Sequence, residues 1–216
     1  QNLLETIHGG NPDRFVKQFE FLQFAFNPHL ANNNECPKGG INVKNGWGVT
    51  QSWREDQPGC IPVHTPELTV IKDIEHWQEY VKAPRIDYGE EDWRPYAEEA
   101  NKVDRDEYFV SGMIYPGLLE HCNALMGMEN SLCAFYENPD EMHDLIAYIT
   151  EWELKFAEGY CTYIKPDALF HHDDWGSSIS TFFPPELFAE FFEGPYKQIY
   201  GYYKDHGVEL IVHHSD

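Results

Sequence analysis

Residues 168–176 read Ala-Leu-Phe-His-His-Asp-Asp-Trp-Gly, and residues 208–216 read Val-Glu-Leu-Ile-Val-His-His-Ser-Asp. In each stretch a short apolar run leads into two histidines and then into acidic residues. Continuous apolar runs of this length are typical of strands in a parallel sheet, where both faces are buried. Because neighbouring strands lie about 4.8 Å apart, we expect the two His-Asp clusters at their ends to share one cleft.

Helical patterns separate these strands from each other and from an earlier apolar run, Tyr108–Met113. A long amphipathic helix begins near Pro139 and ends at Lys165-Pro166, and a second begins at Pro185 with a kink expected at Gly194-Pro195. Strand, helix, strand, helix and strand in succession predict an α/β fold with a parallel sheet. A doubly wound sheet and a (β/α)8 barrel both fit. No Gly-x-Gly-x-x-Gly motif follows a strand, and barrels carry their chemistry at strand ends, so we favour the TIM barrel.

The first third of the chain is rich in turns and has fewer strand signals. Residues 15–24 (FVKQFEFLQF) have the aromatic and β-branched content of a strand, and residues 47–53 (WGVTQSW) form a second extended segment. No linker divides the chain, so residues 1–216 are expected to form a single domain. A full barrel needs at least roughly 200 to 250 residues, and fewer than eight strands are recognisable here. The sequence therefore predicts an incomplete, N-terminal portion of a barrel.

The charge balance excludes several classes of protein. There are 37 acidic and 15 basic residues, which give a formal net charge of −22. Such a field repels nucleic acid and disfavours anionic membrane surfaces. Hydrophobic residues make up 42% of the chain, enough for a folded core. Neither a transmembrane segment nor a signal peptide is recognisable, and the five cysteines form no Cys-x-x-Cys pair, so we expect a cytoplasmic protein with reduced thiols.

The strand-end clusters supply the candidate site. Its residues are His172, Asp173, Asp174, His213 and Asp216. Imidazole and carboxylate groups bind divalent metals or act as general acids and bases. A helix cap or a packed histidine is the structural alternative for one isolated cluster, but two clusters side by side favour a functional site. A serine hydrolase is disfavoured because the Gly-x-Ser-x-Gly elbow is absent.

Further motifs run in order along nearly the whole chain. They are residues 47–84, Pro-Gly-Leu-Leu-Glu at 116–120, the helix around Met142, His-Asp-Asp-Trp-Gly at 172–176, Pro-Pro-Glu at 184–186, Pro195-Tyr196 and the last strand up to His213. Together they resemble the uroporphyrinogen decarboxylase superfamily, particularly its corrinoid-dependent methyltransferase branch. The resemblance implies a (β/α)8 barrel, and members of the family are longer than this chain.

The decarboxylases of that family hold substrate carboxylates with an arginine-rich N-terminal segment and bind pyrrole nitrogens with an aspartate. Here no second arginine follows Arg14, and Asn45 stands before Gly46-Trp47 where relatives often have Asp. A cleft with almost no cations is a poor receptor for a polycarboxylate. A uroporphyrinogen decarboxylase-like reaction is therefore the alternative prediction.

The thiol-activating methyltransferases of the family bind zinc through a His-x-Cys motif and a later Cys. His213 matches the histidine, but Ser215 replaces the cysteine, which disfavours thiol activation. The resemblance still implies zinc bound by His213 among N and O ligands, polarising a methyl ether as a Lewis acid.

We therefore expect a cytoplasmic methyltransferase of anaerobic metabolism that moves a methyl group between a small substrate and a corrinoid carried by a partner protein. O-demethylation of a methoxylated aromatic is one candidate reaction. A non-catalytic subunit that only binds the corrinoid protein is a further alternative. The expected catalytic residues are His172, Asp173, Asp174 and Asp216, with His213 as the metal ligand.

Overall fold

A computed structural model describes residues 1–216. Its strands are β1 (Leu22–Phe24), β2 (Val43–Lys44), β3 (Thr50–Ser52), β4 (Ile61–Pro62), β5 (Phe109–Ile114), β6 (Ala168–His172) and β7 (Leu210–His214). The main sheet has four strands in the order β1-β5-β6-β7, and every neighbouring pair is parallel. A smaller antiparallel sheet contains β2, β3 and β4.

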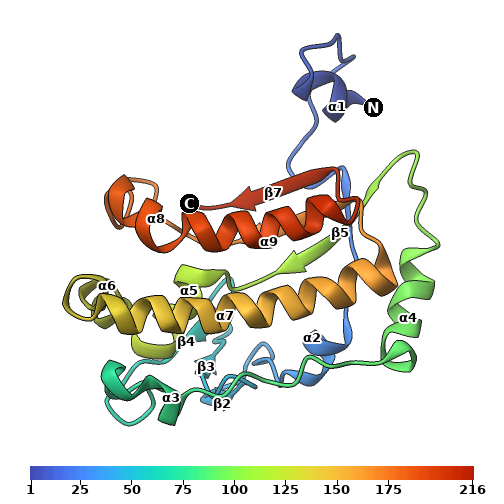
Figure 1. Cartoon of the computed structure of the whole chain (residues 1–216). Coiled ribbons are helices and arrows are strands. Elements are labelled where there is room, and N and C mark those ends of the chain that lie inside the picture. Colours follow the sequence, from blue (N-terminus) through green and yellow to red (C-terminus); the bar gives the residue numbers. More distant parts are fainter.

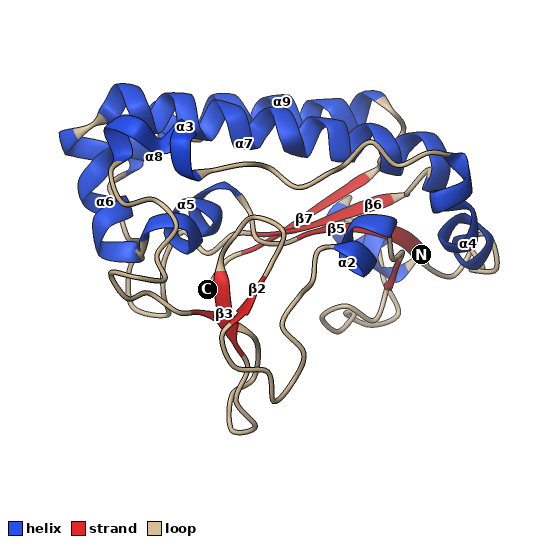
Figure 2. Cartoon of the chain, turned by 90° about the horizontal axis from the view of Figure 1, so that it is seen from below, coloured by secondary structure: helices blue, strands red, loops and turns tan.

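The helices are α1 (Asn2–Ile7), α2 (Pro28–Asn32), α3 (Trp77–Tyr80), α4 (Glu90–Ala100), α5 (Leu118–Met126), α6 (Met128–Glu137), α7 (Pro139–Gly159), α8 (Pro185–Phe191) and α9 (Glu193–Asp205). Most of the helices lie between strands in the chain, and the long helices α7 and α9 cover one side of the main sheet (Figures 1 and 2). A 3-10 turn, η1 (Ile74–His76), precedes α3, and a π-helical turn, η2 (Tyr160–Ile164), continues α7. None of the helices combines the length and the apolar character needed to cross a membrane.

The last three strands follow one another in space as they do in sequence. Helices α5, α6 and α7 lie between β5 and β6, and helices α8 and α9 lie between β6 and β7. The long helices α7 and α9 pack beside each other on the same face of the sheet (Figures 1 and 2). This arrangement confirms the predicted mixed α/β fold with a parallel sheet.

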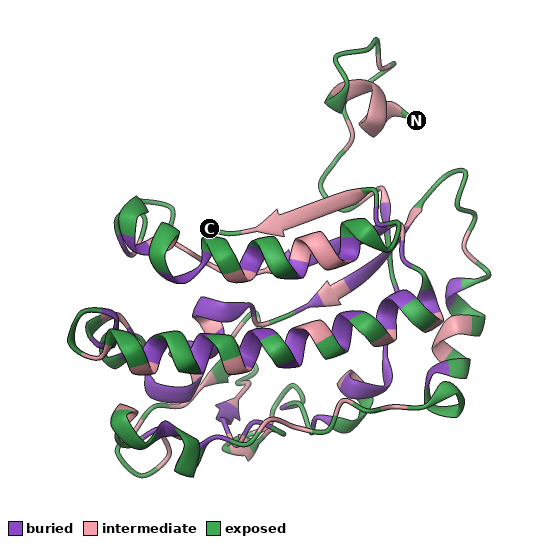
Figure 3. Ribbon diagram, in the orientation of Figure 1, coloured by how far each residue is buried: buried purple, intermediate pink, exposed green.

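Helix α7 forms the largest part of the layer that covers the sheet. Pro139 stands at its first position, where the missing N–H has no helical partner to lose. The buried side chains of α7 recur at helical spacing, and the exposed ones fall between them (Figure 3). Each fully buried Leu or Ile contributes about 1.5–3 kcal/mol relative to an exposed one. Lys165, with a φ of 52°, ends the helix just before Pro166.

Two boundaries differ from those predicted. Of the strand expected over residues 15–24, only Leu22–Phe24 pairs with β5, because Phe19 has a φ of 65° and turns the chain out of the extended conformation. The expected kink at Gly194-Pro195 lies earlier, at Phe192, which separates α8 from α9. The proline therefore lies in the first turn of α9, where it breaks no helical hydrogen bond.

Candidate functional site

The two His-His doublets lie side by side at the carboxyl ends of β6 and β7. In the parallel register His171 is opposite His213, and His172 is opposite His214. The rings of each pair are close to parallel, with centroids 5.9 Å apart in the first pair and 4.6 Å apart in the second. Because side chains alternate along a strand, the first pair faces α7 and α9, and the second pair faces the other side of the sheet. The clusters are therefore adjacent but divided between two faces.

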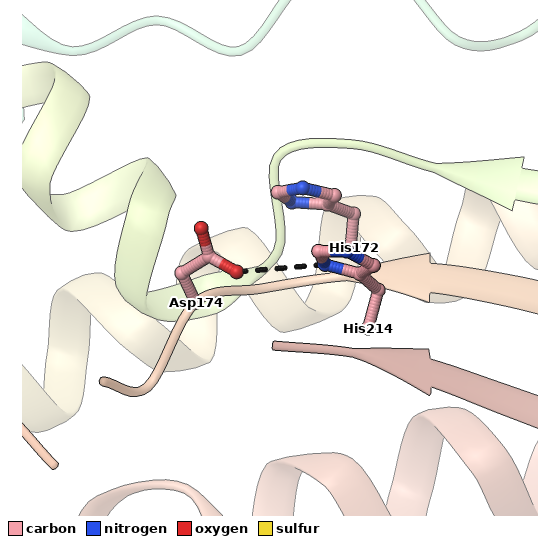
Figure 4. A group of neighbouring side chains, drawn as sticks. All are labelled: His172, Asp174 and His214. Carbon is pink, nitrogen blue, oxygen red and sulfur yellow. Dashed lines mark ion pairs between the residues drawn. The ribbon is translucent and has the colours of Figure 1, made fainter. Parts of the chain in front are cut away.

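His172, Asp174 and His214 form what we call the open His-Asp group (Figure 4). One ligand atom from each of the three residues lies within 4.8 Å of the others. Asp174 Oδ1 is 3.6 Å from His214 Nδ1, a buried nitrogen that has no hydrogen-bond partner. Two imidazoles and a carboxylate are a ligand set that zinc accepts, and the unpartnered nitrogen is available for coordination. The group therefore fits a divalent metal.

Glu120, in the first turn of α5, positions one histidine of this group. Its Oε2 atom lies 2.8 Å from Nδ1 of His172. The hydrogen bond to Glu120 raises the pKa of His172, and burial raises the pKa of Glu120. A carboxylate on one ring nitrogen orients the other nitrogen, which is the usual arrangement behind a metal-binding histidine.

Asp173 is fully buried and connects three elements. Its carboxylate accepts hydrogen bonds from the backbone N–H groups of Leu119 (3.1 Å) and Glu120 (2.8 Å). It also accepts from the indole N–H of Trp175 (2.9 Å) and from the hydroxyl of Tyr196 on α9. Helix α5 has no side-chain cap of its own, so Asp173 caps it from a distant part of the sequence. All four partners are donors directed at one carboxylate.

His213, predicted from the sequence to bind metal, lies on the helix-covered face. Its Nδ1 is 3.0 Å from the hydroxyl of Tyr200, and its Nε2 is 3.1 Å from the carbonyl oxygen of Asp173. Because a carbonyl only accepts, Nε2 carries the proton and Nδ1 accepts from the tyrosine. Burial lowers the pKa of His213 to about 4, so the ring is neutral. Both ring nitrogens have partners, and strand alternation brings His214 instead into the open His-Asp group.

Asp216 reaches the group through its backbone. Its N–H donates to Oδ1 of Asp174 at 3.0 Å, while the side chain is exposed. The hydroxyl of Ser215 accepts a hydrogen bond from the N–H of Trp175 at 2.9 Å. These contacts attach the end of β7 to the loop after β6.

A cavity of 360 Å³ adjoins the open His-Asp group at the end of β5. Asp174, a member of that group, lines the cavity, and so does Glu120, the hydrogen-bond partner of His172. Trp47, Trp152 and Phe156 form aromatic walls. None of the 24 lining residues is Lys or Arg. The volume lies within the range of about 300–1,000 Å³ found for small-molecule sites.

Sequence reasoning gave no role to Glu120 or to a fully buried acid, Glu153, whose Oε2 is 3.3 Å from Nε2 of His171. Glu153 does leave a signal, because it is a charged residue on the face of α7 that the apolar spacing marks as buried. Glu120 occurs in the Pro-Gly-Leu-Leu-Glu motif, but nothing in its spacing connects it to a histidine 52 residues away.

The chain matches no protein-family model, no curated protein and no solved structure at a significant level. The resemblance to the uroporphyrinogen decarboxylase superfamily therefore stays a prediction.

Proposed function

We propose that this protein is a metal-assisted methyltransferase that moves a methyl group between a small methyl ether and a corrinoid carried by a partner protein. The observation that supports this most directly is the open His-Asp group beside an aromatic cavity without cations. A metal ligand set on one side and a site for an uncharged ring on the other are the two parts that demethylation of a methoxylated aromatic requires.

The chain's own residues have separate tasks in this reaction. His172, Asp174 and His214 would hold the metal, and Glu120 fixes the ring of His172. A bound zinc ion would draw electron density from the ether oxygen of the substrate. The aromatic walls bind the substrate ring and exclude water from it. The ether oxygen would keep both electrons of the methyl carbon–oxygen bond as it breaks, and the reduced cobalt(I) corrinoid would supply the electron pair of the new cobalt–carbon bond.

The cavity does not favour the decarboxylase alternative. A porphyrinogen-like substrate carries several carboxylates, which proteins bind with arginine and lysine. The lining contains neither, and it adds carboxylates of its own from Glu35, Glu120 and Asp174. These carboxylates would repel the carboxylates of a substrate bound in the same cavity.

We also propose that the main sheet is part of a (β/α)8 barrel. Its strands are parallel, the last three are in sequential order, and α7 and α9 cover the same face, as the helices of a barrel do. The open His-Asp group then lies where barrel enzymes carry their chemistry, at the carboxyl ends of the strands. The proposal places the protein in the cytoplasm, where thiols such as its five free cysteines persist.

Metal content distinguishes the two histidines of β7. Zinc should be present in the purified wild-type protein and in His213→Asn, and absent from His214→Asn, when each is measured by elemental analysis. Because these residues are adjacent and both partly buried, they are matched controls. Wild-type protein that holds no metal after incubation with zinc would overturn the metal site.

Methyl transfer to free cob(I)alamin, followed by its absorbance, tests the reaction. We expect methylation with a methoxylated aromatic donor and a marked loss in His214→Asn. An absence of turnover together with tight binding of a corrinoid protein would show instead that the chain is a non-catalytic subunit.

A further inference from the structure

Two of the five free cysteines, Cys36 and Cys60, lie together at one end of the small sheet. The sulfur of Cys60 lies against both the thiol and the backbone N–H of Cys36. Cys36 is 3% exposed, and Cys60 is partly exposed. Neither residue belongs to the open His-Asp group, and neither lines the cavity of 360 Å³. The pair is therefore a second cluster of reactive side chains, outside the candidate site.

Backbone pairing in the small sheet brings the two cysteines together. The register of β3 and β4 places Cys60 beside Trp53. On its opposite edge, Trp53 donates its backbone N–H to the carbonyl oxygen of Gly40 (2.9 Å) and accepts from the N–H of Gly39 (2.7 Å). A Cβ atom on Gly40 would lie only 2.8 Å from Sγ of Cys36, so this sulfur packs directly against the same turn. The fold of the small sheet therefore sets the contact between the two thiols.

Two thiols in contact can form a disulfide with small changes in their side-chain torsions, because the bond joins atoms that already lie together. The thiolate is the form that reacts. Burial raises the pKa of Cys60 to about 12, and the neighbouring Cys36 and Glu35 add to this effect. The Cys60 thiolate is therefore scarce at neutral pH, and we expect the pair to react slowly with an oxidant.

The two cysteines enclose the segment of chain that forms one wall of the cavity. The lining residues that lie between them in the sequence are Asn45, Trp47, Val49 and Gln51. Glu35 and Ile61, the residues just outside the pair, line the cavity as well. A covalent bond between Cys36 and Cys60 would close this segment into a loop and restrict its unfolding.

We propose that Cys36 and Cys60 are a site of reversible oxidation, at which a peroxide joins them in a disulfide that holds this wall of the cavity in place. The more exposed sulfur, that of Cys60, attacks hydrogen peroxide and becomes a sulfenic acid, and one water molecule is released. The sulfur of Cys36 then displaces the hydroxyl group, which leaves as a second water molecule with the proton of the Cys36 thiol. Two thiols are oxidised to one disulfide, and the peroxide is reduced to water. A dithiol reductant reverses the reaction by exchange. The proposal is independent of the proposed function.

Peptide mapping after treatment with hydrogen peroxide tests the pairing. Trypsin releases Cys36 in peptide 18–38 and Cys60 in peptide 55–72, because it cleaves after lysine and arginine. In the oxidised folded protein we expect these peptides as one species, lighter than their sum by two hydrogen atoms, and formed within hours. Dithiothreitol should separate them. A folded protein that yields no such species, or in which other pairs of cysteines cross-link as readily, would overturn the proposal.

Two serine variants provide matched controls. Cys60→Ser should abolish the cross-link and leave Cys36 as a free thiol, and because Cys60 is only partly buried we expect this variant to fold. Cys161→Ser removes a buried cysteine of η2 and should leave the yield of the cross-link unchanged. If Cys161→Ser loses the cross-link as completely as Cys60→Ser, the assignment of the pair is wrong.

Urea unfolding shows whether the bond fits the folded structure. A disulfide that closes a loop of this length should raise the urea midpoint of the oxidised protein by about 1 M over that of the reduced protein. The rise should be absent when Cys60→Ser is treated in the same way. A midpoint that stays the same or falls on oxidation of the wild type would show that the disulfide does not hold the wall in its folded position.

Discussion

Replacement of Asp173 by Asn should destabilise the protein although the two side chains have nearly the same shape. The carboxylate is fully buried, and all of its partners are donors. Oδ2 accepts from Leu119 N–H, from Trp175 Nε1–H and from the Tyr196 hydroxyl, and Oδ1 accepts from Glu120 N–H. An asparagine has one oxygen and one NH2 group, and the NH2 group must then face a donor.

The least damaging rotamer of the variant keeps its oxygen at the Oδ2 position and places NH2 against the N–H of Glu120. One hydrogen bond to a charged acceptor is then lost, which costs about 1.5–3 kcal/mol, and the three that remain become neutral and weaker. The negative charge at the N-terminus of α5 also disappears, which adds about 0.3–1 kcal/mol. We expect a total loss of about 2–4 kcal/mol from the free energy of unfolding, and a larger loss for Asp173→Ala.

Urea unfolding followed by circular dichroism measures this loss. For an m-value of about 2–3 kcal/mol/M, the midpoint should fall by about 1 M. Asp144→Asn is the matched control, because this carboxylate is exposed on the outer side of α7. If Asp173→Asn unfolds within about 0.5 kcal/mol of the wild type, the four-donor account of Asp173 is wrong.

Three further predictions follow from the same region. A Cβ atom on Gly117 would come within 2.7 Å of His171 Cε1, so Gly117→Ala should destabilise by about 1–3 kcal/mol and lower Tm measurably; an unchanged Tm would contradict the contact. The pKa values of His29 (about 4) and His121 (about 3) lie below the ordinary 6.5, so the unfolded chain takes up protons first as the pH falls. The free energy of unfolding should therefore fall below pH 6.5, by about 1.4 kcal/mol per histidine near pH 5.5. In His121→Gln this fall should be smaller by about the same amount. If the wild type and the variant lose the same free energy of unfolding between pH 7 and pH 5.5, the prediction is wrong. Glu120→Gln should weaken zinc binding about 10–100-fold in a competition assay, and an unaltered affinity would show that Glu120 does not position His172.

The parallel strands were predictable because their sequences are continuous apolar runs between turn or helix signals. β5, β6 and β7 all lie close to their expected places. The small sheet was harder to predict, because β2 (Val43–Lys44) and β4 (Ile61–Pro62) are two residues long and contain no periodic pattern. Their backbone pairing to β3 depends on the approach of loops that the local sequence does not encode. β1 is shorter than the aromatic content of residues 15–24 suggested, because the positive φ of Phe19 turns the chain before Leu22.

The candidate site shows a similar division. The strand ends indicated where the histidines and aspartates would gather, because the ends of parallel strands meet at one edge. Which histidine of β7 faces the open side depends on where the alternation of side chains along the strand begins. Because His213 and His214 are adjacent and identical, the sequence does not show which of them that is. The remaining parts, Glu120 and the polar residues Gln51 and His29, come from elements far away in the sequence. Only the packing of α2, β3 and α5 around β5 brings them to the same cavity.

Because His213 and His214 are adjacent in β7, inserting one residue before this strand and deleting one residue before it should have different effects on the open His-Asp group. An inserted residue that shifts the strand forward by one position would place Val212 where His213 lies and His213 where His214 lies, so an imidazole would still stand beside His172. A deletion of one residue would bring Ser215 to that place instead and leave the site one ligand short. The open His-Asp group should therefore survive a one-residue insertion in the loop between α9 and β7 better than a one-residue deletion. After the insertion, Val212 would replace His213 on the helix-covered face of the sheet.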